Sequence, residues 1–111
     1  MVLYCREVME VKYRLDRENL YIYSYGELDE YTADKARREI DKIIEDNAPS
    51  KSVIFDFANL SFMDSTGIGV LLGRYKKIKK IGSKAYISRP SFTVNKILQI
   101  SGLYDVMPKI I

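Results

Sequence analysis

One short segment of the sequence concentrates the side chains that could carry chemistry. It spans residues 59–69 (NLSFMDSTGIG) and places Asp64, Ser65 and Thr66 together, directly before a glycine. An apolar stretch typical of a buried strand precedes it and a stretch with helical periodicity follows it, so these three residues fall where a helix should begin. Binding sites in open α/β sheets gather at such strand-to-helix junctions. The segment therefore indicates a site at the start of that helix.

The chemistry that fits Ser65 is phosphorylation. A hydroxyl in the first turn of a helix is held in one place near the surface, and a phosphate there adds roughly 1.5 to 2 negative charges. The unpaired N–H groups and the dipole of a helix N-terminus tolerate this charge, whereas the neighbouring Asp64 opposes it. A purely structural interpretation also fits, because Asp, Ser and Thr are ordinary helix N-caps and Gly67 and Gly69 permit close packing.

Two other kinds of chemistry would use carboxylates. Asp56 falls at the end of the apolar run that begins at Val53, where a receiver-type domain carries the aspartate that becomes phosphorylated. No acidic pair ends an earlier strand to bind the Mg²⁺ that this reaction needs. Asp29, Asp56 and Asp64 are also the candidates for an acid–base pair in a small enzyme, although their spacing does not favour one.

The composition narrows the function classes. The 111 residues include no histidine and one cysteine, Cys5, which argues against most zinc sites, against histidine-dependent catalysis and against an internal disulfide. The net charge is a mild +3, and no apolar stretch is long enough to span a membrane. We therefore expect a cytoplasmic protein that contacts neither nucleic acid nor membrane directly and holds no metal or cofactor.

The hydrophobic periodicity predicts a single domain over residues 1–111, of the α/β class, in the order β-β-α-β-α-β-α-β. We expect a single mixed β-sheet of 4–5 strands with helices packed against it, the first two strands forming a hairpin. The predicted strands are 10–16, 19–27, 51–57, 84–88 and a short one within 103–110. The predicted helices are 32–47, 65–81 and one from Ser91 to Gly102.

The same periodicity predicts which side chains are buried. In the second strand, Leu20, Ile22 and Ser24 share one face, and Tyr21, Tyr23 and Tyr25 share the other. The tyrosine face is interpreted as a covered sheet face, with an interface as the alternative. The helix at 65–81 is expected to bury Ile68, Leu71, Leu72, Tyr75 and Ile78. Thr32 and Ser91 are the expected N-caps of the flanking helices.

The sequence resembles a known family over about residues 9–110. Residues 26–40 (GELDEYTADKARREI), 59–88 (NLSFMDSTGIGVLLGRYKKIKKIGSKAYIS) and 97–103 (ILQISGL) are similar to the anti-sigma factor antagonists of the STAS class. Within that class they are similar to the sporulation type of endospore-forming bacteria. The most specific feature is Asp-Ser-Thr-Gly, preceded by Ser-Phe-Met and followed in the next helix by Gly-Arg-Tyr-Lys.

The resemblance implies a function and a set of partners. In that family the serine directly after the aspartate, here Ser65, is phosphorylated by the cognate anti-sigma factor, which is a serine kinase. The unphosphorylated form binds this kinase and releases a sporulation sigma factor, the phosphorylated form does not, and a phosphoserine phosphatase restores the first form. The protein would be a substrate and not an enzyme. The implied partner-binding residues are Asp29, Asp64, Ser65, Thr66 and Gly67.

Two departures from the family pattern concern the ends of the chain. Members commonly carry one more helix after the last strand, whereas this chain stops at Ile111, so either its C-terminal surface differs from that of the family or the chain is a shortened form. Residues 1–8 are expected to be an N-terminal extension.

A run of basic residues also needs an interpretation. It comprises Arg74, Lys76, Lys77, Lys79 and Lys80. We interpret it as the solvated end of a helix, where cations suit the dipole, with a patch that meets an acidic partner surface as the alternative.

Overall fold

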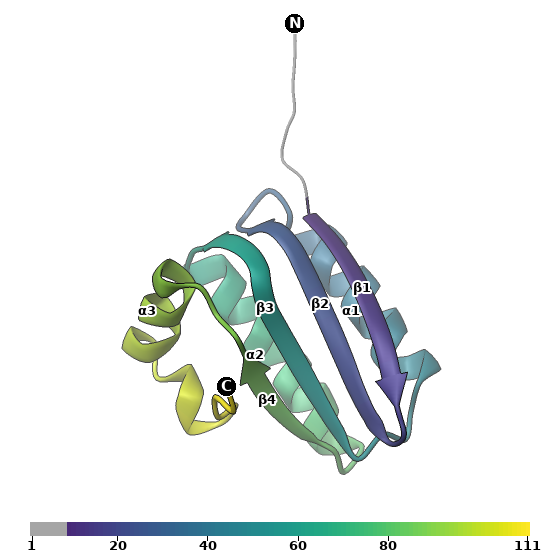
Figure 1. The fold of residues 1–111 in the computed structure, drawn as a ribbon. Helices are drawn as coiled ribbons and strands as arrows, with labels where there is room; N and C mark the ends of the chain where they lie inside the picture. Colours follow the sequence, from purple (N-terminus) through teal and green to yellow (C-terminus); the bar gives the residue numbers. More distant parts are fainter. Residues whose placement is uncertain (1–8) are drawn as a thin grey trace, which may run out of the picture.

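The computed structural model describes residues 9–111, whose strands form one four-stranded sheet in the order β1-β2-β3-β4 (Figure 1). β1 pairs with β2 antiparallel, and the remaining pairs are parallel. The predicted extension at residues 1–8, with Cys5, lies outside the described residues. The strands are β1 (Met9–Asp16), β2 (Asn19–Leu28), β3 (Ser52–Met63) and β4 (Lys84–Ser88). The helices are α1 (Ala33–Asp46), α2 (Ser65–Lys80) and α3 (Phe92–Ile100), followed by a 3₁₀ turn at Leu103–Asp105.

The predicted hairpin and its two faces are confirmed. Asp16 pairs with Asn19, so Arg17 and Glu18 form a two-residue turn, in which Arg17 adopts a positive φ of 60°. Leu20 and Ile22 are fully buried beneath the helices. This alternation places the apolar side chains of β2 on one face, as the sequence period of two requires.

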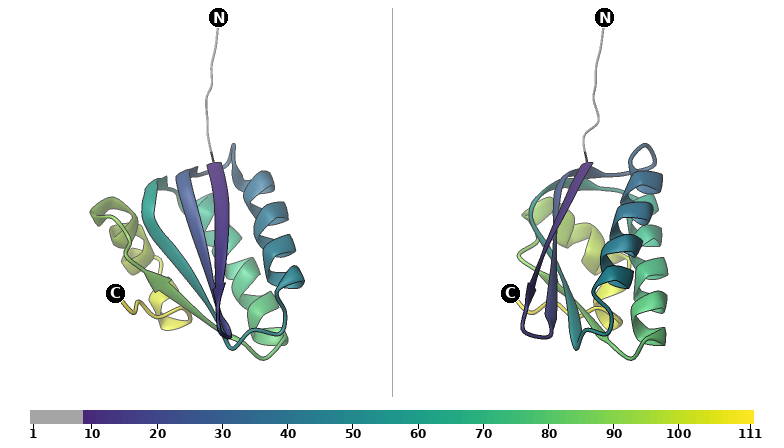
Figure 2. Two further views of the ribbon diagram at one scale, coloured as in Figure 1. Left: turned by 45° about the vertical axis from the view of Figure 1, so that its right-hand side comes forward. Right: turned by 90° about the vertical axis from the view of Figure 1, so that its right-hand side faces the viewer.

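The helices are distributed unequally around the sheet. α1 and α2 cover one face side by side, whereas α3 and the C-terminal segment lie beyond the β4 edge (Figure 2). The core lies between the sheet and α1 and α2 and extends to Val94 and Leu98 of α3, and Phe55 and Phe57 of β3 are fully buried in it. In the described part of the chain, no helix covers the opposite face.

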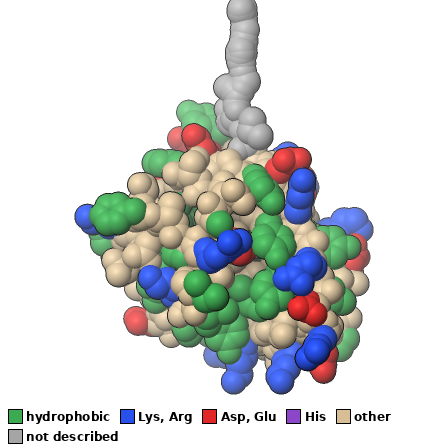
Figure 3. All heavy atoms as spheres, viewed as in Figure 1, with side chains coloured by type: hydrophobic (Ala, Val, Ile, Leu, Met, Phe, Trp, Pro, Cys, Tyr) green, Lys and Arg blue, Asp and Glu red, His purple; other side chains and the backbone are tan. Residues whose placement is uncertain are grey.

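Hydrophobic and basic side chains line this uncovered face (Figure 3), and tyrosines of β2 are among them. Tyr21 and Tyr23 stack with ring centroids 6.5 Å apart, and the Arg14 guanidinium lies 4.7 Å from the Tyr21 centroid. Lys12 lies over the ring of Tyr25. The tyrosines are half-buried by one another and by these cations, so the expectation of a covered sheet face is not met within residues 9–111.

Strand β3 is longer than predicted. The sequence predicts that the strand ends at Phe57, but the strand continues to Met63 because β2 also continues and supplies hydrogen-bonding partners as far as Leu28. Two register shifts accommodate the extension, one between Tyr23 and Tyr25 and one between Gly26 and Glu27. The predicted loop before α2 therefore shrinks to a single residue, Asp64.

The predicted last strand is wrong. Residues 103–105 form a 3₁₀ turn, and among the described residues the rest of the segment contributes an isolated parallel bridge between Ile87 and Lys109. Pro108 has no N–H to donate, although its carbonyl accepts a hydrogen bond from the Ile87 N–H at 2.9 Å. The observed order ends β-α, without the eighth element.

The predicted buried stripe of α2 is wrong at one position. Leu72 is 38% exposed, whereas Val70 is fully buried. The side of α2 that faces the sheet is the buried one, and its buried residues are Gly67, Val70, Leu71 and Ile78. Leu72 is hydrophobic, but no strand or helix of the described residues packs over its side chain.

The two expected N-caps differ in outcome. Ser91 caps α3, its hydroxyl accepting a hydrogen bond from the Val94 N–H at 3.2 Å. Thr32 occupies the N-cap position of α1, but its side chain makes no capping bond and turns back into the preceding loop.

Ion pairs join α1 to α2 through the basic run. Arg74 Nε lies 2.8 Å from Asp41 Oδ1, and Lys77 lies 2.9 Å from Glu45 Oε2. The hydrogen bond that Lys77 donates to the Glu45 carboxylate is the main cause of the raised pKa of Lys77. The predicted solvated face is therefore confirmed for Lys76, Lys79 and Lys80, and Arg74 is instead partly buried.

None of the helices within residues 9–111 is both long and apolar enough to cross a bilayer.

Candidate phosphoacceptor site

Ser65 is the first residue of α2 and is exposed at the edge of the sheet where the parallel strands end. The residue before it, Asp64, has extended backbone and is the N-cap. Its Oδ1 accepts hydrogen bonds from the N–H groups of Thr66 at 2.9 Å and Gly67 at 3.3 Å. The Asp64 carbonyl accepts the Ile68 N–H at 3.3 Å. The Asp64 side chain thus occupies two of the first-turn amides that a free helix N-terminus would leave unpaired, those of Thr66 and Gly67.

The start of α2 is fixed against β2. The Asp64 N–H donates to the Leu28 carbonyl at 3.3 Å. Gly67 is buried, and a β-carbon built there would lie 2.6 Å from Met63 Cγ and 2.9 Å from the Leu28 oxygen. Glycine is therefore required at this position by the close approach of the helix to the strands. Ser65 therefore projects from a closely packed junction.

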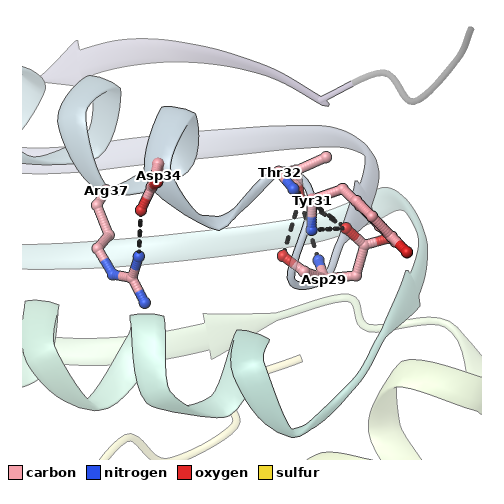
Figure 4. A network of polar contacts seen from close by, with 5 residues as sticks. All are labelled: Asp29, Tyr31, Thr32, Asp34 and Arg37. Atoms are coloured by element: carbon pink, nitrogen blue, oxygen red, sulfur yellow. Dashed lines mark hydrogen bonds and ion pairs between the residues drawn. The ribbon is translucent and has the colours of Figure 1, made fainter.

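The loop between β2 and α1 is held together by Asp29 (Figure 4). Asp29 Oδ1 accepts hydrogen bonds from the N–H groups of Tyr31 at 2.9 Å and Thr32 at 3.1 Å. The Asp29 N–H donates to Thr32 Oγ1 at 3.0 Å, and the Thr32 hydroxyl donates to the Glu27 carbonyl at 2.9 Å. These bonds bury Asp29 and Thr32 and leave Glu30 and Tyr31 exposed.

The predicted site residues lie at one edge of the sheet, but they are not equally accessible. Leu28 pairs with Met63, so Asp29 and Asp64 follow neighbouring strand ends. Ser65 is exposed, Asp64 and Thr66 are half-buried, and Asp29 and Gly67 are buried. Asp29 and Gly67 therefore shape the surface from beneath.

Exposed aromatic side chains at the same edge were missed by sequence reasoning. Tyr31 in the β2–α1 loop, Phe62 near the end of β3 and Phe92 at the start of α3 are all exposed, Phe92 to 80%. All three follow or end strands that run toward the Ser65 edge (Figure 1). Large exposed apolar groups at one edge are typical of an interaction surface. Strand alternation in β3 could have indicated Phe62, but the other two carry no sequence signal.

The environment of Asp56 differs from that expected of the phosphorylated aspartate of a receiver-type domain. It lies within β3, is almost completely buried, and its Oδ2 lies 2.9 Å from Arg89 Nε. Its Oδ1 accepts the Ala58 N–H at 3.0 Å. The hydrogen bond that Arg89 donates to the Asp56 carboxylate is the main cause of the raised pKa of Arg89. Within residues 9–111 there is no group of three or more His, Cys, Asp or Glu side chains that could hold a metal ion. The receiver-type alternative has no support.

Comparison with known proteins gives consistent results. The STAS domain family matches residues 11–111. The anti-sigma F factor antagonist of Paenibacillus polymyxa is 34% identical over 100 residues, covering 90% of this chain and 85% of the relative. The anti-sigma-B factor antagonist of Bacillus subtilis is 28% identical over 99 residues, covering 89% of this chain and 88% of the relative.

Solved structures give the same result. The anti-sigma factor antagonist SpoIIAA in its unphosphorylated form superposes with a TM-score of 0.74 at 33% identity, covering 94% of this chain and 89% of that one. The Bacillus cell fate determinant SpoIIAA in the phosphorylated form gives a TM-score of 0.66 at 32% identity, covering 94% and 92%.

Proposed function

This chain belongs to the STAS-domain family, and from that premise we propose that it is an anti-sigma factor antagonist of the sporulation type, switched by phosphorylation of Ser65. The observation that supports Ser65 most directly is its place on α2: the hydroxyl is exposed at the first helical position, and Asp64 already caps the helix. The relatives named as antagonists, and the related structures in unphosphorylated and phosphorylated forms, support the same assignment.

The unphosphorylated form binds the anti-sigma factor, a serine kinase, and thereby releases a sporulation sigma factor in the cytoplasm. The contact surface is the edge around Ser65, with Asp64 and Thr66 in direct contact. Asp29 and Gly67 contribute by holding the β2–α1 loop and the start of α2 in place. A phosphoserine phosphatase restores this form.

Phosphorylation acts by local exclusion. The N–H groups of Thr66 and Gly67 are engaged by Asp64 Oδ1, so they are not free to neutralise a phosphate on the neighbouring serine. The phosphate therefore adds its charge beside the Asp64 carboxylate at an exposed position. Charge and bulk at the surface exclude the kinase, and the fold beneath does not need to change.

The acceptor is tested by incubating the chain with the cognate kinase and ATP and measuring the intact mass. The wild type and Ser61→Ala, a control that removes a neighbouring exposed serine, should each gain one phosphate. Ser65→Ala should gain none. A phosphate that persists on Ser65→Ala would assign the acceptor to another residue, with Thr66 the first to examine.

The switch is tested by kinase binding. Ser65→Asp should lose binding while its unfolding midpoint stays close to that of the wild type, because the change lies at an exposed position. If Ser65→Asp binds as tightly as the wild type, or if it unfolds the chain, exclusion by surface charge is wrong.

A further inference from the structure

Four lysines lie at the end of the molecule opposite Ser65. They are Lys51 before β3, Lys79 and Lys80 in the last turn of α2, and Lys84 at the start of β4, and together they are called the basic end. The parallel strands begin here and finish at the Ser65 edge, so the two surfaces lie at opposite ends of the sheet (Figure 1). Blue side chains gather along this lower end in Figure 3.

The charges of the basic end are not paired with carboxylates in the part of the chain that the structure describes. Lys77, which precedes Lys79 by two residues on α2, forms ion pairs with Asp41 and Glu45. In contrast, across residues 9–111 no acidic side chain forms an ion pair with any of the four lysines, and all four are exposed. A cluster of free cations of this kind creates a positive potential that attracts an anionic partner.

The surface between these lysines is hollowed. One hollow of about 390 Å³ is lined by Lys79, Lys84, Tyr75 and Tyr86, among others, and an adjacent one of about 350 Å³ by Lys51, Lys84, Asn19 and Tyr86. Lys84 and Tyr86 belong to both. Each hollow thus combines lysines with a tyrosine wall and is large enough for a side chain of a bound segment.

We propose that the basic end binds a carboxylate-rich segment of a partner protein. Lysine ammonium groups pair with carboxylates. The hollows can receive side chains of a bound protein segment, whereas a flat lipid surface has no side chains to insert into them. Because the basic end is remote from Ser65, a partner there and the kinase at the Ser65 edge can bind at the same time.

The test measures fluorescence anisotropy of a labelled oligoglutamate peptide against the full chain. Lys51→Gln/Lys84→Gln should weaken binding about fivefold to tenfold, as expected for the loss of two exposed charge contacts. Lys12→Gln/Lys96→Gln changes the net charge equally at other exposed sites and should bind like the wild type. Added salt should weaken wild-type binding. Thermal unfolding of both variants checks that they are folded.

The proposal is overturned if the two double variants weaken peptide binding equally, since the effect would then reflect net charge alone. It is also overturned if the wild type binds anionic phosphatidylglycerol vesicles or a DNA duplex more tightly than the peptide at the same salt concentration. The outcome is separate from the proposed function, because Ser65→Ala should bind the peptide like the wild type whether or not Ser65 is the acceptor.

Discussion

Gly67 packs directly against the backbone of Leu28, so that a β-carbon at residue 67 would approach the Leu28 oxygen to 2.9 Å. The same contact holds the β3–α2 junction against the end of β2, since the Asp64 N–H also donates to that oxygen. Leu28 is the last residue before the loop that Asp29 organises. One backbone carbonyl therefore connects the two segments that form the Ser65 edge.

The first prediction concerns this packing. Gly67→Ala should destabilise the chain by about 1 to 3 kcal/mol, because the new methyl group overlaps backbone and Met63. Gly69→Ala is the matched control: its β-carbon would meet nothing within 4 Å, and alanine should stabilise the helix by about 0.5 to 1 kcal/mol. Urea unfolding measures both. Equal stability of the two variants would show that the close approach at Gly67 is not a constraint.

The second prediction separates the cap from the charge at Asp64. Asp64→Ala removes the oxygen that accepts two amide protons and should cost about 1 kcal/mol of unfolding free energy. Asp64→Asn keeps a side-chain oxygen and should retain most of that stability. Kinase binding, measured on both variants, then reports what the negative charge contributes. A loss of stability in Asp64→Asn as large as in Asp64→Ala would contradict the capping role.

The residues that sequence reasoning located correctly are those governed by local rules. The alternation at Leu20 and Ile22, and the Ser91 cap, depend on neighbours along the chain, and the structure has them as predicted. Ser65 likewise falls at the first turn of α2, since the helical period begins there.

The features that were missed depend on contacts between distant segments. β3 continues past Phe57 because β2 offers a partner, which no pattern within residues 58–63 indicates. Asp29 looks like an exposed acidic loop residue, yet its carboxylate turns toward its own loop. Leu72 is as hydrophobic as Leu71, and the position of the sheet alone decides which is buried.

The third prediction tests the loop. Asp29→Ala leaves the N–H groups of Tyr31 and Thr32 without their acceptor and should cost about 1 to 3 kcal/mol. Asp29→Asn keeps a side-chain oxygen that can accept both of these bonds, so its unfolding free energy should lie between those of Asp29→Ala and the wild type. Glu30→Ala, one residue away and exposed, should change the stability by less than about 0.5 kcal/mol. If Glu30→Ala proves as destabilising as Asp29→Ala, the hydrogen bonds of Asp29 do not account for the loop.

The fourth prediction concerns the ion pair that joins α1 to α2. The Arg74 side chain is only 11% exposed and its Nε lies 2.8 Å from Asp41 Oδ1. Asp41→Asn leaves this guanidinium without its partner and should cost about 1 to 3 kcal/mol, less than the 3–5 kcal/mol of a fully buried pair. Asp46→Asn breaks the exposed pair with Lys42 on the same helix and should cost less than about 0.5 kcal/mol.

A double variant distinguishes the pair itself from the burial of an unpaired charge. Asp41→Leu/Arg74→Met replaces both partners by apolar side chains at the α1–α2 contact. It should be more stable than Asp41→Asn, because no desolvated guanidinium is left without a carboxylate. Chemical unfolding of the three variants provides the measurement. If the double variant is instead less stable than the wild type, the attraction between Arg74 and Asp41 exceeds the cost of removing both charges from water, and the pair itself stabilises the helix packing.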